Sequence, residues 1–223
     1  TDVCKNGTLG TEVITVFEFQ STVSAVNGGA LPAGIAVNDT VRFTVRVPLA
    51  AATSATPAGG AGCPVGAVDC STAAWTIPAS PYTLTYSSGY VQTGTIDHIE
   101  IIDGGYQDGG GAPMNEDDEI VFFQGGKSIF KATGGNDWYS GSIPADLATA
   151  TSNIDQAGLF DTTLYLGDEG SWDSIHDDNA KPQAVTLVRS GEMQQLCAGG
   201  AFRDTNTVTF QSTVTLVTGA KLP

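Results

Sequence analysis

The chain has 223 residues, of which 41% are hydrophobic and 15% charged, and 24 acidic against nine basic side chains give a net charge of −15. Such a surface repels phosphate backbones and anionic headgroups, so we expect neither nucleic-acid binding nor membrane insertion, and cations are the natural small partners. No apolar run approaches the roughly 18 residues of a spanning helix. The chain begins with Thr1, as a processed secreted protein would.

Period-two alternation of apolar and polar residues runs through the chain and predicts strands. The clearest case is residues 40–47, TVRFTVRV, where Val41, Phe43 and Val45 point one way and the Thr and Arg side chains the other. Further strands are predicted over residues 82–86, 95–102, 119–123, 128–132, 160–166 and 184–188. Gly, Asn, Asp and Pro clusters separate them, as turns require.

The five letters FQSTV occur near both ends of the chain, within residues 16–26 and again within residues 208–217. Both stretches predict unusually long strands with one apolar face and an opposite face rich in Thr and Gln. We expect these strands to pair, either within one domain or between neighbouring subunits, although coincidence among Thr/Val-rich strands is the alternative. The apolar positions expected to define these assembly strands are Phe17, Phe19, Val23, Phe210, Val214 and Leu216.

One short helix is predicted within residues 145–156, with Pro144 as its opening residue. About nine or ten strands and one helix predict an all-β fold, an antiparallel β-sandwich of jelly-roll type with long loops. We expect a single domain over residues 1–223. Residues 50–74 are rich in Gly, Ala and Pro and predict a long surface loop.

Four cysteines predict two disulfides. Cys63 and Cys70 flank a short segment of the predicted surface loop, and Cys4 and Cys197 would then join the N-terminal region to the last strand. Zinc is the competing interpretation, but the chain has no C-x-x-C pair and its two histidines are far from any cysteine in the sequence. Disulfides predict a secreted, extracellular protein.

Acidic residues gather in two Gly-rich stretches, residues 97–119 and 161–178, which suit a hard cation such as Ca²⁺ with its roughly six to eight oxygen ligands. Neither stretch contains an EF-hand pattern, so solvated acidic loops are the alternative. The candidate metal ligands are Asp103, Asp108, Asp117 and Asp118 in the first stretch and Asp168, Asp173, Asp177 and Asp178 in the second.

Aromatic residues in predicted loops, Trp138, Tyr139 and Trp172, could stack on sugars as a carbohydrate-binding platform, or could instead fill the ends of the core. No G-x-S-x-G motif occurs and no cysteine is expected to be free, so we predict no catalytic residues and no enzyme. A glycoside hydrolase with paired carboxylates is a distant alternative. No organic cofactor is expected.

Residues 21–47, STVSAVNGGALPAGIAVNDTVRFTVRV, resemble the opening of secreted bacterial proteins of the PEP-CTERM, exosortase-sorted kind. Val37, Asn38, Asp39, Thr40, Phe43 and Thr44 stand in the matching places, and residues 161–174 have a similar character. Two departures are Arg46-Val47-Pro48, where that family has Tyr-Asp, and the lack of a sorting tail in this sequence. The resemblance implies a cell-surface or matrix location, mostly without catalysis.

Together these features predict a non-catalytic extracellular surface or matrix protein that associates with itself, as a filament or sheet, by strand addition at the chain ends. Either the N-terminal arm or the C-terminal strand would enter a sheet of the next subunit. A Ca²⁺-dependent carbohydrate-binding module that recognises cell-surface glycans is the alternative function.

Overall fold

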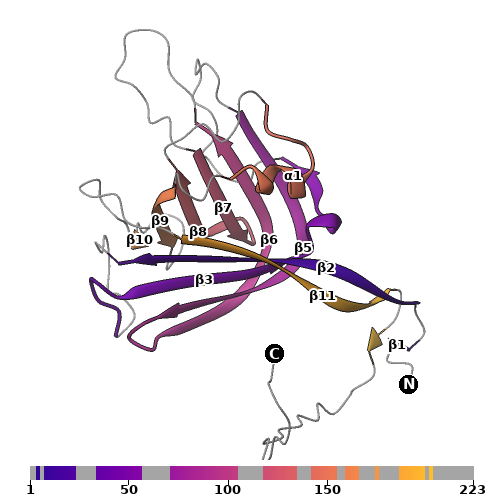
Figure 1. Ribbon diagram of the computed structural model, residues 1–223, viewed down its shortest axis with the longest axis horizontal. Helices are drawn as coiled ribbons and strands as arrows, with labels where there is room; N and C mark the ends of the chain where they lie inside the picture. Colours follow the sequence, from indigo (N-terminus) through magenta and orange to yellow (C-terminus); the bar gives the residue numbers. More distant parts are fainter. Residues whose placement is uncertain are drawn as a thin grey trace, which may run out of the picture. The chain divides into compact units, whose positions relative to one another are not determined.

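A computed structural model describes residues 4–5, 8–23, 34–56, 71–104, 118–134, 142–154, 159–165, 174–175, 186–198 and 201–202. Strands dominate these residues (Figure 1). The elements are β1 (Cys4–Lys5), β2 (Thr8–Thr22), β3 (Thr40–Val47), the 3₁₀ turn η1 (Leu49–Ala51), β4 (Thr53–Ala55), β5 (Ser71–Tyr86), β6 (Val91–Asp103), β7 (Asp118–Gln124), β8 (Lys127–Gly134), α1 (Leu147–Ser152), β9 (Leu159–Tyr165), β10 (Ser174–Ile175), β11 (Thr186–Ala198) and β12 (Ala201–Phe202).

The chain divides into two compact units. The larger unit is Val13–Gln194, and the smaller one combines Thr1–Glu12 with Gln195–Pro223. One ten-stranded sheet has the order β10-β9-β8-β7-β6-β5-β3-β2-β11, with β4 paired to β5, and β1 pairs separately with β12 (Figure 1). Every pairing with a determined register is antiparallel.

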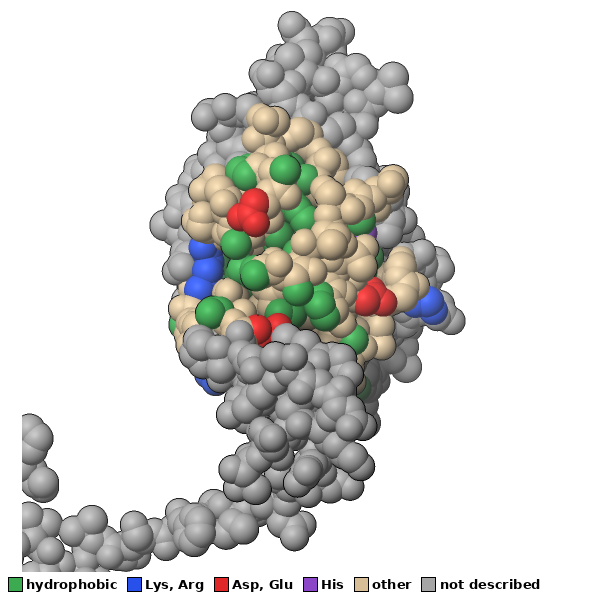
Figure 2. All heavy atoms as spheres, turned by 90° about the vertical axis from the view of Figure 1, so that its right-hand side faces the viewer, with side chains coloured by type: hydrophobic (Ala, Val, Ile, Leu, Met, Phe, Trp, Pro, Cys, Tyr) green, Lys and Arg blue, Asp and Glu red, His purple; other side chains and the backbone are tan. Residues whose placement is uncertain are grey.

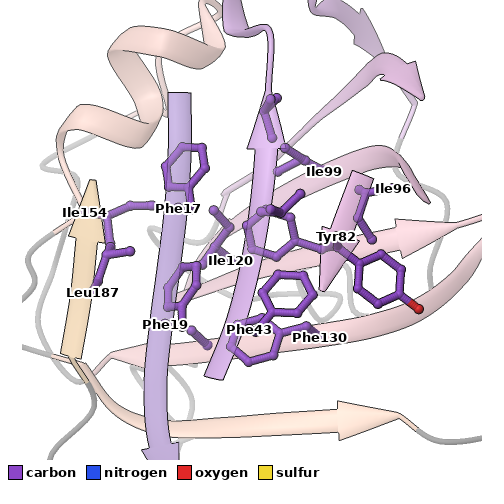
Figure 3. Close-up of a cluster of buried hydrophobic side chains, with 14 of the residues drawn as sticks. Phe17, Phe19, Phe43, Tyr82, Ile96, Ile99, Ile120, Phe130, Ile154 and Leu187 are labelled. Carbon is purple, nitrogen blue, oxygen red and sulfur yellow. The ribbon is translucent and has the colours of Figure 1, made fainter. Parts of the chain in front are cut away.

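The sheet of the larger unit curls around an aromatic core (Figure 3). Phe19 of β2 lies 5.0 Å from Phe130 of β8 between ring centroids, although four strands separate β2 from β8 in the sheet order. Phe43 of β3 stacks on the same Phe130 ring at 4.3 Å. Further along, the Ser21 hydroxyl of β2 is 2.6 Å from the Thr162 hydroxyl of β9. Contacts between strands so far apart in the order require a strongly curled sheet.

The alternation that predicted these strands is confirmed where side chains are described. In β3 the Val and Phe side chains are buried, and the residues between them are at least partly exposed. Phe17 and Phe19 of β2, and Val23 directly after it, are at most 1% exposed. On the other face, Arg42 of β3 contacts Glu18 and Gln20. One face of each strand therefore enters the core.

The predicted short helix is present as α1, residues Leu147–Ser152. The Asp146 carboxylate caps it by accepting hydrogen bonds from the Thr149 backbone amide and hydroxyl, both at 2.8 Å, and these bonds lower the pKa of the Asp146 carboxyl. Leu147 and Ala150 are buried in the same core as the sheet. The indole of Trp75 donates to the Ala145 carbonyl at 2.8 Å and fixes the approach to the helix.

The antiparallel all-β class is thus confirmed, whereas the jelly-roll arrangement stays a prediction. Within residues 50–74, where a surface loop was predicted, Thr53–Ala55 form β4 and pair with β5, which already begins at Ser71. Its cysteines, Cys63 and Cys70, lie outside the described residues.

Candidate functional site

The two chain ends meet in one ladder. Cys4 lies opposite Phe202 and Lys5 opposite Ala201 in the antiparallel pair of β1 and β12. Cys197 lies in β11, the strand that precedes β12, but neither cysteine side chain is among the described ones. The predicted Cys4–Cys197 disulfide therefore stays a prediction, and the backbone pairing places both cysteines on strands of the chain ends.

The first copy of FQSTV is an internal strand of the sheet. From Thr15 to Thr22, β2 pairs in register with β3, and its other neighbour in the sheet is β11. Because Phe17, Phe19 and Val23 are buried in the chain's own core, their side chains are not available to another subunit. The corresponding residues of the second copy, Phe210, Val214 and Leu216, lie outside the described residues.

Strand β11 lies at the end of the sheet order. It has 13 residues, and β2 is the single neighbour that the described part of the chain provides for it. Leu187 is buried in the core beside Ile154 (Figure 3), and the Arg189 guanidinium donates to the Ile154 carbonyl at 2.7 Å. In contrast, Val188 is 56% exposed. The first half of β11 is therefore anchored on its inner face, and its outer face is open to solvent.

Natural sheets usually protect such an edge with Lys, Pro, a bulge or a covering element. The sequence of β11, TLVRSGEMQQLCA, contains no Lys and no Pro, and the guanidinium of its Arg189 is bound to α1's C-terminal segment. An edge of this length, lacking both of these protective residues, can accept another strand through its backbone N–H and C=O groups.

Two of the predicted metal ligands lie at neighbouring strand ends. Asp103 ends β6 and Asp118 begins β7, and each lies one position beyond the last pair in the register of the two strands, Ile102 with Glu119. Both are nearly inaccessible to solvent, with exposures of 3% and 0%. The Asp118 carboxylate accepts from the Gly104 amide at 3.0 Å, and Ser71 donates to Asp103 at 3.4 Å.

Adjacent buried carboxylates repel each other unless a cation, a proton or hydrogen-bond donors offset their charge, so this pair is a candidate cation site. In the part of the chain that the structure describes, no group of three or more acidic, His or Cys side chains forms a metal site. The remaining predicted ligands lie outside the described residues; they are Asp108, Asp117, Asp168, Asp173, Asp177 and Asp178.

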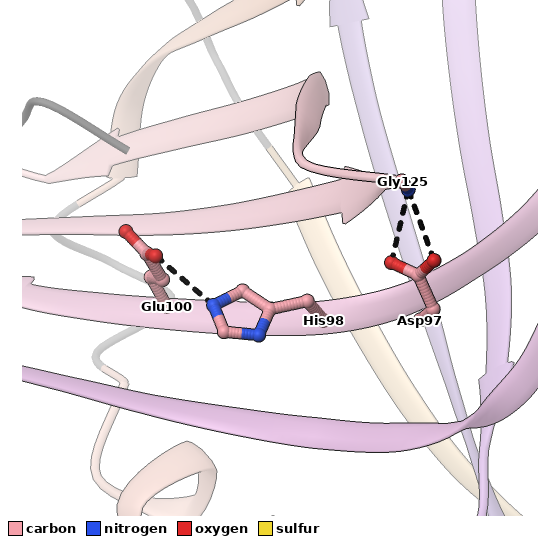
Figure 4. A network of polar contacts seen from close by, with 4 residues as sticks. All are labelled: Asp97, His98, Glu100 and Gly125. Atoms are coloured by element: carbon pink, nitrogen blue, oxygen red, sulfur yellow. Dashed lines mark hydrogen bonds and ion pairs between the residues drawn. The ribbon is translucent and has the colours of Figure 1, made fainter. Parts of the chain in front are cut away.

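A buried polar contact lies on the outer face of β6 (Figure 4). His98 and Glu100 are two residues apart on one strand, so their side chains share a face, and His98 Nε2 lies 3.0 Å from Glu100 Oε1. Glu100 is 1% exposed, and the ring of Phe123 packs edge-on against His98 at 5.4 Å. Because both side chains are buried from solvent, a structural role is favoured for them. Sequence reasoning located both residues in a strand but missed their burial.

Beside this pair, Asp97 holds the turn between β7 and β8. Both of its carboxylate oxygens accept from the Gly125 amide, at 3.2 and 2.9 Å (Figure 4). Gly125 and Gly126 have φ values of 57° and 80°, which glycine adopts without strain. The acidic residues of β6 thus have structural partners where they are described.

The predicted carbohydrate platform of Trp138, Tyr139 and Trp172 lies outside the described residues. Trp75, in contrast, is 1% exposed and belongs to the core. No helix among the described segments is long and apolar enough to cross a membrane. Comparisons of the chain with family models, with curated proteins and with solved structures find no match.

Proposed function

We propose that this chain is a non-catalytic, extracellular structural protein of a cell surface or matrix, which associates with copies of itself through strands at the chain ends. The observation that carries the proposal is the 13-residue edge strand β11, which has one strand neighbour in the described part of the chain and is followed directly by the ladder of the chain ends. A strand edge of this kind binds another strand by the same backbone hydrogen bonds that hold a sheet together.

The distribution of charge supports close approach of two copies. Although the net charge is −15, one face of the molecule carries mostly uncharged side chains, with isolated acidic groups and with Lys and Arg near its margins (Figure 2). Electrostatic repulsion between two copies falls off over a screening length of about 8 Å at physiological ionic strength, and this length shortens as salt is added. We therefore expect association to strengthen as salt is raised.

The test is the mass of the purified full chain, kept oxidised, measured by light scattering over a range of concentrations at low and high salt. The expected result is a concentration-dependent population well above the 22.9 kDa of one chain, with filaments or sheets visible by negative-stain electron microscopy. A mass of 22.9 kDa at every concentration and salt would refute self-association. Intact-mass analysis should also find all four cysteines oxidised, as an extracellular protein requires.

The second candidate function is Ca²⁺ binding, which would serve the alternative of a carbohydrate-binding module. It is favoured by the buried, opposed positions of Asp103 and Asp118. Isothermal titration of chelator-treated protein with CaCl₂ should give binding that Asp103→Asn and Asp118→Asn each weaken at least tenfold, while Asp97→Asn, a turn residue, leaves it unchanged. Equal affinity in all the variants would refute this site. Glycan binding that is lost in Trp138→Ala and Trp172→Ala would favour the carbohydrate-binding alternative.

As to architecture, we propose that a second layer lies on the outer face of β6 and β7, as a jelly-roll-type sandwich would have. The support is burial on both faces of the sheet. Ile102, Val121 and Phe123 form a second apolar cluster apart from the main core, and His98 and Glu100 are buried with them. An uncovered sheet face would leave these side chains exposed.

A further inference from the structure

The N-terminal arm and the C-terminal segment are the two candidates for the strand that a neighbouring subunit receives, and the structure argues against the arm. Cys4–Lys5 of the N-terminal arm is already paired with β12, and β2, which begins at Thr8, is flanked by β3 and β11 in its own chain. To donate these strands, the arm would have to break existing backbone pairing. We therefore consider residues 208–217, which carry the second FQSTV copy, as the donor.

The sequence of residues 208–217, VTFQSTVTLV, matches that of a strand that already fits beside β11. The same five letters stand at the end of β2, where Phe19 and the following Val23 are buried in the core while Gln20 and Thr22 are more exposed. A strand on the other side of β11 meets the same inside and outside of the sheet, so it needs the same alternation. Phe210, Ser212, Val214 and Leu216 provide it at matching spacing.

Residues 208–217 follow β12 after a spacer of five residues, 203–207. Such a spacer extends by up to about 17 Å, which exceeds the distance of about 5 Å between paired strands.

We propose that residues 208–217 of one copy add as a strand to Thr186–Gln194 of a second copy, along the edge of β11 that faces away from β2. This inference rests on the proposed function and names the two surfaces that would meet. Donor and acceptor are different parts of the chain, so each copy can receive one strand and give one. Repetition of such a head-to-tail contact produces open filaments unless the geometry closes a ring.

Two pairs of substitutions in the full chain separate acceptor from donor. Val188→Lys places a charge on the outer face of the accepting edge, and Val91→Lys is its control, because both valines are 56% exposed. For the donating strand, Ser212→Pro and Thr213→Pro are made as two separate variants. Because the backbone N–H groups of successive strand residues point to opposite edges, one of the two prolines removes an N–H group from the contact between copies. Thr205→Pro, in the spacer, is the control.

We expect Val188→Lys and at least one donor proline to raise the concentration needed for assembly at least tenfold, and both controls to assemble as the unsubstituted chain does. The decisive measurement mixes Val188→Lys with the assembly-defective proline variant. The first retains an intact donor and the second an intact edge, so the mixture should form one-to-one dimers of two 22.9 kDa chains and nothing longer. Formation of that dimer also proves that both variants are folded.

The outcomes distinguish this inference from the proposed function. If the unsubstituted chain is monomeric under all conditions, self-association itself fails, and this inference fails with it. If it assembles and all the variants assemble equally well, self-association stands but occurs through other surfaces. If the two defective variants stay monomeric when mixed, the strand does not pass between copies, and the proposal is overturned.

Discussion

Substitution of Gly94 tests how tightly the core is packed where β5 and β6 pair. Gly94 lies directly opposite Tyr82, and a Cβ atom at Gly94 would lie 2.6 Å from Cε1 and 2.9 Å from Cζ and Oη of that ring. Tyr82 is 3% exposed and its ring lies 5.6 Å from that of Phe43 between centroids. The tyrosine thus covers the glycine, as aromatic rings do on sheets, and Gly94→Ala must displace the ring.

The expected cost follows from three effects. Insertion of a methyl group into a packed core costs about 1–3 kcal/mol. Movement of the ring also strains the hydrogen bond of 3.0 Å that Gln92 donates to the Tyr82 hydroxyl, which contributes about 1 kcal/mol. Loss of glycine's flexibility in the unfolded chain returns about 0.4–1 kcal/mol. We therefore expect Gly94→Ala to lower the free energy of unfolding by about 1–3 kcal/mol.

The assay is urea denaturation followed by tryptophan fluorescence, with the disulfide state held constant, in a set of double-mutant cycles. Tyr82→Phe keeps the ring atoms that the new methyl group meets, so most of the Gly94→Ala cost should remain in that background. Tyr82→Leu removes them, so Gly94→Ala should become neutral or stabilising there. A Gly94→Ala cost that is the same in the Tyr82→Leu background as in the unsubstituted chain would refute the reasoning.

Three further predictions concern buried polar groups. Ser21→Ala removes one partner of the 2.6 Å hydrogen bond to Thr162 and should lower the free energy of unfolding, measured by urea denaturation, by about 1–2 kcal/mol. The double variant Ser21→Ala with Thr162→Val should lose less than the sum of the two single losses. Glu100→Ala leaves buried His98 without its hydrogen-bond partner at 3.0 Å and should cost about 1–3 kcal/mol. Glu18→Ala, which breaks an exposed ion pair, should cost about 0.5 kcal/mol or less, and equal losses in the two variants would contradict this account. Burial raises the pKa of the Tyr86 phenol above its ordinary value of 10, so stability is complete below pH 10 and is lost as the pH rises toward the folded-state pKa. Tyr86→Phe should reduce this alkaline loss, measured as the fall in melting temperature between pH 7 and a pH above 10. An equal fall in the Tyr86→Phe variant and the unsubstituted chain would count against the prediction.

Strands with one buried and one exposed face were predictable from the sequence, because each such strand needs alternating side chains. The eight residues of β3 and the first FQSTV copy in β2 are examples. The part of β5 before Tyr82 was not predictable, because Pro78 and Pro81 argue against a strand. The register shifts between Thr76 and Ser80, around Pro78, and the Ser80 hydroxyl donates to the Pro78 carbonyl there. Irregular pairing of this kind accommodates prolines that a regular ladder excludes.

The candidate sites were predictable only as residue types. Asp103 and Asp118 are separated by a long connection, so their opposition depends on the register of β6 and β7, which no local pattern encodes. Burial of Glu100 was likewise hidden, because alternation predicts a solvated outer face and β6 is buried on both sides at that point. The length of β11 was underestimated because residues 189–195, RSGEMQQ, are almost uniformly polar, which removes the periodic signal.

The doubled pentapeptide gains a physical explanation from the position of β11. A duplicated domain would repeat the residues around FQSTV, and the flanking residues of the two copies differ. Similarity confined to one strand instead indicates a shared environment. β2 occupies one side of β11, and any strand on the other side must present apolar residues to the same core and polar residues to the same solvent, in phase with β11. Two strands that flank one common neighbour would thus converge on one pattern, and the second of them would come from the next copy.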